Sequence, residues 1–71
     1  MKNTLQKRFG IRVRASRNAL GWSQEEFAHK CGLDRTYVSG IERGVRNPTL
    51  EIIGILAGGL GVSLQRLFED I

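Results

Sequence analysis

Apolar residues recur along most of the chain at the three- and four-residue spacing of amphipathic helices. In a first segment from about residue 4 to 20, one face would hold Leu5, Phe9, Val13, Ser16 and Leu20. The basic side chains fall on the other faces of that segment. Gly21 follows in the position of a left-handed helix cap. This pattern predicts a long first helix with one buried side.

Four shorter helices follow, each introduced by a residue that favours a helix N-terminus. The expected N-caps are Ser23, Asp34, Thr49 and Ser63. The expected C-terminal stops are Gly32, Gly44 and Gly61. The fourth helix would turn inward Leu50, Ile53, Leu56, Ala57 and Leu60. The chain therefore predicts an all-α fold, a compact five-helix bundle.

The second and third helices have the pattern of a helix-turn-helix, although an ordinary corner between two helices is the alternative. Gly32 permits a sharp turn, and Ala28 is small enough for the two helices to cross closely. The third helix, 34–43, buries Val38 and Ile41 and leaves an opposite side of Arg35, Thr36, Ser39 and Gly40. Glycine costs a helix about 1 kcal/mol relative to alanine. An exposed glycine there indicates a surface that something approaches closely.

Length and charge narrow the class of protein. The chain has 71 residues, enough for a single domain, 1–71, whose core is marginal without oligomerisation. Residues 1–46 hold ten Lys/Arg against four Asp/Glu, whereas residues 47–71 hold one against three. With a pI near 10.0, this polarity predicts nucleic-acid binding, the alternative being a solvated basic face without a partner.

Several other classes are excluded by composition. One cysteine allows no internal disulfide, and no apolar run approaches the roughly 20 residues of a membrane span. The basic N-terminus lacks the apolar region of a signal peptide, so we expect a cytoplasmic protein. His29 and Cys31 point to different helix faces, and no metal-ligand spacing occurs. We therefore expect no enzyme activity, no metal and no cofactor.

Three stretches resemble the phage-repressor-like (Xre-type) helix-turn-helix family. They are "LGWSQEEFA", "YVSGIERG" and "RNPTLEIIGILAGGLGVSLQRLF", and the similarity runs from Phe9 to Phe68. The stretch "LDRTYVSGIERGVRNPTL" further resembles the controller proteins of restriction–modification systems. A DNA-binding antitoxin and a small prophage repressor remain the alternatives.

This resemblance implies a double-stranded DNA operator as the partner, with helix 34–43 in the major groove. The residues expected to read bases are Arg35, Thr36, Tyr37, Ser39 and Arg46. Those expected to contact phosphates are Ser23, Gln24, Arg43 and Asn47. For Tyr37 the alternative is a half-buried core aromatic, and for Arg43 a solvated cation at a helix end. The resemblance also pairs Arg17 with Glu42 in a semi-buried ion pair.

A homodimer would let two recognition helices read a palindrome whose half-sites lie roughly 34 Å apart. The residues predicted for its interface are Ile52, Ile55, Gly59, Leu64, Phe68 and Ile71. The alternative is that the last helix packs Leu64 and Phe68 onto its own core. The controller resemblance implies control of the protein's own gene and of a restriction endonuclease gene. No small-molecule effector is expected.

Overall fold

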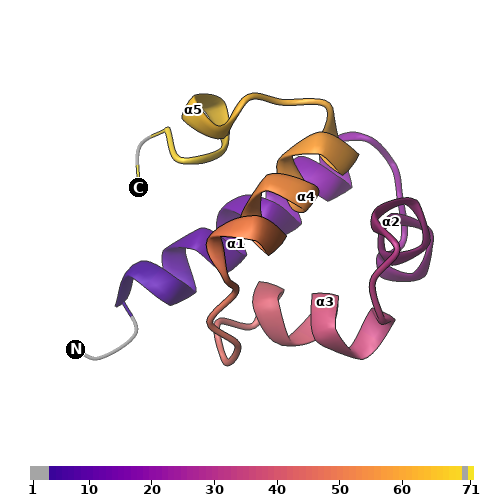
Figure 1. The fold of residues 1–71 in the computed structure, drawn as a ribbon, viewed down its shortest axis with the longest axis horizontal. Helices are drawn as coiled ribbons and strands as arrows, with labels where there is room; N and C mark the ends of the chain where they lie inside the picture. The colour runs from indigo at the N-terminus through magenta and orange to yellow at the C-terminus, as the bar shows by residue number, and fades with distance from the viewer. Residues whose placement is uncertain (1–3, 70) are drawn as a thin grey trace.

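The computed structural model describes residues 4–69 and residue 71, and this part of the chain forms five α-helices and no strand. Their bounds are α1 Thr4–Ala19, α2 Gln24–Cys31, α3 Arg35–Glu42, α4 Leu50–Leu60 and α5 Leu64–Leu67. In Figure 1, α4 lies in front of α1, with α2 to the right of this pair, α3 below it and α5 above it. The all-helical bundle predicted from the sequence is confirmed.

The predicted caps set the helix boundaries. Each of the four expected N-caps has an extended backbone, and its side chain accepts a hydrogen bond from an N–H of the first turn. At α2 the capping box is complete: the Glu26 N–H donates to Ser23 Oγ at 3.0 Å, and the Ser23 N–H to Glu26 Oε1 at 2.8 Å. Gly32 and Gly61 end their helices with φ values of 70° and 72°. Local chemistry therefore determines where α2 and α4 begin and end.

One core joins the helices. Its buried members are Phe9, Val13, Phe27, Ala28, Val38, Ile41, Leu56, Ala57, Leu60 and Leu67. On α1 the buried side continues to Arg17, which is 8% exposed. Val38 and Ile41 anchor one side of α3 in this core, so the other side of that helix is left facing outward.

The predicted inward positions at three helix ends are wrong. Leu5 and Leu20 are 60% and 46% exposed, and Leu50 is 78% exposed. Leu5 lies in the first turn of α1, Leu20 follows its last residue, and Leu50 is the first residue of α4. The apolar residues keep helical spacing up to these ends, but the other helices do not cover them there.

Gly10 places α3 against α1. A Cβ at this glycine would lie 2.6 Å from the main-chain oxygen of Glu42, closer than real Cβ contacts come. The main chains of the two helices therefore touch where a larger residue would separate them. This contact positions the C-terminal end of α3.

Candidate nucleic-acid interface

The turn between α2 and α3 has helix-turn-helix geometry. Ala28 is buried in the core, and its carbonyl accepts a hydrogen bond from the Leu33 N–H at 2.9 Å. Gly32 makes the reversal with its positive φ. Asp34 then caps α3. Figure 1 shows α3 along one edge of the molecule, reached from α2 through this short turn.

The first turn of α3 presents polar side chains to the outside. Arg35 and Thr36 are exposed, and Ser39 is half-buried one turn further on. Asp34 Oδ1 accepts hydrogen bonds from the Thr36 N–H at 3.0 Å and the Thr36 hydroxyl at 2.8 Å. These two bonds hold the pKa of Asp34 below its ordinary value. The Thr36 hydroxyl proton is therefore used by the cap, and its oxygen is left to accept.

Gly40 is not exposed, contrary to the sequence interpretation. It is buried, and the side chain of Arg46 lies across it. The guanidinium carbon of Arg46 is 5.5 Å from the centroid of the Tyr37 ring, within the range of a cation–π contact. Tyr37 is half-buried against the core. The outer surface here consists of an arginine side chain laid over a glycine.

The residues predicted to contact phosphates have different environments. Ser23, Arg43 and Asn47 are exposed. Gln24 is half-buried, and its Nε2 donates to Glu42 Oε1 at 3.0 Å. This hydrogen bond ties the first turn of α2 to the end of α3. The sequence analysis did not predict this structural role for Gln24.

Arg17 and Glu42, which the resemblance pairs, are in bidentate contact. Arg17 Nε donates to Glu42 Oε2 at 2.7 Å and Nη2 to Oε1 at 2.9 Å, while Nη1 donates to the Trp22 carbonyl at 2.6 Å. Arg14 Nε lies 3.5 Å from the same carboxylate. Gln24 and Arg14 were not foreseen, because residues so far apart in sequence share no local pattern.

Burial and charge act in opposite directions on this carboxylate. Burial raises the pKa of Glu42, but hydrogen bonds from Arg17, Gln24 and Arg14, with the charge of Arg17, bring it below its ordinary value. The hydrogen bond to Glu42 raises the pKa of Arg17 further, against the effect of burial. Both groups are therefore charged at neutral pH.

The residues predicted for a dimer interface lie on α4 and on the chain from α5 onward. Ile55, Leu64 and Phe68 are 37%, 46% and 38% exposed, and Ile52 and Ile71 are half-buried. Phe68 also stacks on Phe9, with ring centroids 5.1 Å apart. Its ring therefore packs partly on the chain's own core and partly faces outward.

Gly59, also predicted for that interface, is half-buried and has close neighbours within its own chain. A Cβ there would lie 2.5 Å from Cys31 Sγ and 3.3 Å from a ring carbon of Phe27. Its lack of a side chain thus lets α4 pack on α2 within one chain. Gly58, in contrast, has nothing within 4 Å of such a Cβ.

Metal ligands, membrane-spanning helices and a reactive cysteine are the other features that we searched for in the described part of the chain. In residues 4–69 and 71, no three His, Cys, Asp or Glu side chains gather as metal ligands would. None of the helices within those bounds is long and apolar enough to cross a membrane. Cys31 is half-buried, and burial raises the pKa of its thiol, so it is not an activated nucleophile.

A helix-turn-helix at the end of a small helical bundle, with polar side chains on its second helix, defines a class of DNA-binding protein. A family profile described as helix-turn-helix matches residues 13–67. The chain belongs to this helix-turn-helix family.

Its relatives narrow the class. Control protein C.MunI of a Mycoplasma species is 43% identical over 70 residues, which cover 97% of this chain and 95% of that protein. The crystal structure of the restriction–modification controller protein C.AhdI from Aeromonas hydrophila is 45% identical, with a TM-score of 0.88 over 92% of this chain and 94% of that one. The C.Esp1396I tetramer in complex with its natural 35 base-pair operator is 39% identical, with a TM-score of 0.87 over 93% and 87%.

These similarities agree with the resemblance found in the sequence. The chain is a DNA-binding transcriptional regulator of the restriction–modification controller type and not an enzyme.

Proposed function

We propose that this protein binds a palindromic DNA operator as a homodimer and thereby controls its own gene and a restriction endonuclease gene. α3 enters the major groove. Arg35, Thr36, Tyr37 and Ser39 face the bases, Arg46 reaches the DNA from the following loop, and Ser23, Arg43 and Asn47 grip phosphates on either side.

The observation that carries this proposal is the two-sided character of α3. Val38 and Ile41 are buried in the core, with 0% and 1% exposure, and Arg35 and Thr36 are exposed on the first turn. The helix is thus held rigidly by one side while the other presents donors and acceptors. An exposed arginine at the start of a recognition helix is suited to bidentate contact with the O6 and N7 atoms of guanine.

Two further features support a dimer on an operator. One eight-residue α3 reads only a few base pairs, and two-fold symmetry doubles the sequence that is read. The related C.Esp1396I forms a tetramer on its natural 35 base-pair operator. We infer that two copies of this chain form a dimer on the DNA and that they meet through Ile52, Ile55, Leu64, Phe68 and Ile71.

Footprinting on the DNA upstream of the protein's own gene tests the proposal. We expect protection of two half-sites related by two-fold symmetry, with centres about one helical turn apart. A reporter fused to the same DNA should respond to the protein when it is supplied in trans. Protection that follows no sequence, or a site without symmetry, would contradict the proposed operator.

A second reporter tests the proposed target. It carries the promoter of the restriction endonuclease gene that the proposal assigns as the target, with a scrambled operator as the control. An equal response from the intact and scrambled promoters would exclude control of that gene.

A further inference from the structure

The main chain of Gly40 holds the loop that carries Arg46. The N–H groups of Val45 and Arg46 donate to the Gly40 carbonyl at 2.9 and 3.2 Å. Gly44, which lies between Gly40 and these two residues, turns the chain with a φ of 77°. Glycine adopts this conformation without steric cost. These contacts fix the origin of the Arg46 side chain relative to α3.

The missing side chain of Gly40 gives the Arg46 stem its place. A Cβ at Gly40 would lie 2.5 Å from Arg46 Cγ and 3.4 Å from Nε. The position of Cγ depends on χ1 alone, so moving only the tip of the arginine cannot relieve this overlap. The side chain would have to change its χ1 rotamer, and that change would swing the guanidinium away.

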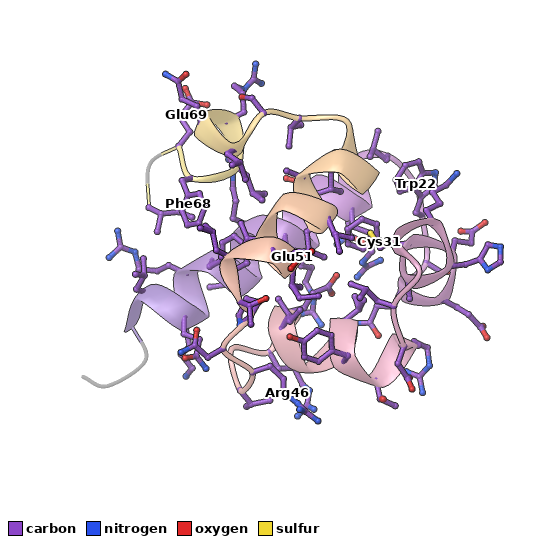
Figure 2. The ribbon with its side chains drawn as sticks, in the orientation of Figure 1. Trp22, Cys31, Arg46, Glu51, Phe68 and Glu69 are labelled. Atoms are coloured by element: carbon purple, nitrogen blue, oxygen red, sulfur yellow. The ribbon has the colours of Figure 1, made fainter. Side chains whose placement is uncertain are left out.

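Tyr37 supports the other end of the arginine. It lies one helical turn before Gly40, and its ring centroid is 5.5 Å from the guanidinium carbon of Arg46. Because Tyr37 packs against the core, its ring offers a fixed plane. Figure 2 shows Arg46 at the edge of the molecule beside α3.

We propose that Gly40 is a positioning residue for DNA recognition: by lacking a side chain it holds Arg46 against Tyr37 in one orientation before DNA binds. This inference rests on the proposed function, which assigns Arg46 to the DNA. Ordering a long side chain before binding lowers the entropic cost of binding. Gly40 acts only through Arg46 and does not touch the DNA.

The first test uses the free protein. NMR relaxation of Arg46 Nε reports how restricted the side chain is on the picosecond-to-nanosecond timescale. We expect a lower order parameter in Gly40→Ala and in Tyr37→Leu than in wild type. Gly54→Ala is the matched control, because Gly54 is also within a helix but nothing lies within 4 Å of a Cβ there.

An unchanged order parameter for Arg46 in Gly40→Ala would overturn the proposal. Should that variant not fold, Tyr37→Leu decides: a wild-type order parameter there overturns the proposal, and a lowered one supports it.

The second test is a double-mutant cycle in operator binding. Gly40→Ala should weaken binding about tenfold in the wild-type background, within the range of coupling between residues in contact. In the Arg46→Ala background the same substitution should cause no further loss. Equal losses in both backgrounds would overturn the positioning role.

The outcomes separate the two proposals. If wild type shows no preference for the operator over unrelated DNA, the proposed function fails. If wild type binds the operator and Arg46→Ala weakens binding but Gly40→Ala does not, only the positioning role fails.

Discussion

Arg17 and Glu42 join the end of α1 to the end of α3 through two parallel hydrogen bonds of 2.7 and 2.9 Å. Both side chains are nearly buried, with residue exposures of 8% and 4%. A pair of this kind is tolerated only when its geometry is good and further hydrogen bonds satisfy the remaining atoms. The Trp22 carbonyl and Gln24 supply those bonds. The pair therefore ties the C-terminal end of α3 to the C-terminal end of α1.

Arg17→Lys tests the importance of the guanidinium fork. Lysine keeps the charge but cannot donate along two parallel directions. We expect the free energy of unfolding to fall by roughly 1–3 kcal/mol, the cost of losing a hydrogen bond to a charged group. Urea unfolding followed by circular dichroism measures it. Arg35→Lys, on the exposed side of α3, is the control and should leave stability unchanged; an equal loss there would contradict the interpretation.

Stability should fall in acid because of Glu42. Its pKa in the folded protein is lower than its ordinary value, so the unfolded state binds the proton first as pH decreases. The stabilisation is complete above the unfolded pKa of about 4.3 and is lost as pH falls through the lower folded value. Unfolding curves between pH 7 and pH 3 measure this dependence, with the pH values chosen to bracket about 4.3.

Two variants show which carboxylate causes the loss of stability in acid. Glu42→Gln should flatten it. Asp34, whose pKa is also lowered, contributes in the same direction, and Asp34→Asn keeps a good N-cap while removing that titration. If Glu42→Gln retains the full wild-type dependence, Glu42 is not its source.

Arg35→Ala tests base reading by the first turn of α3. Loss of a bidentate contact to guanine should cost roughly 1–3 kcal/mol in operator binding and relax the preference at one base pair in each half-site. Binding to a set of operators with each position changed in turn measures both effects. A uniform loss on every sequence would instead make Arg35 a phosphate ligand.

Ile55→Glu tests the proposed dimer interface. Ile55 is 37% exposed, so the substitution should leave the fold intact while placing a charge between the two chains. We expect a folded monomer in sedimentation and strongly reduced operator affinity. Ile11→Glu, at a position on α1 that is 64% exposed, is the control and should remain a dimer. A dimeric Ile55→Glu protein would place the interface elsewhere.

The sequence by itself determined the helices and their boundaries. Ser23, Asp34, Thr49 and Ser63 form the caps expected of them, because a cap depends on residues only two or three positions away. Helical spacing also identified Val38 and Ile41 as the buried side of α3, and this was enough to indicate which side of the helix presents Arg35. Family resemblance supplied the pairing of Arg17 with Glu42, which no local pattern contains.

Only the tertiary structure decided how side chains meet across the fold. Gly40 was expected to be exposed and is buried under Arg46; Gly59 was expected between two chains and packs on Cys31 of its own. Leu50 fits the helical period but has no partner and is 78% exposed. Periodicity records which residues share a face, whereas burial depends on what the rest of the chain brings against that face. For the glycines, the deciding contact comes from a loop or another helix that no local pattern specifies.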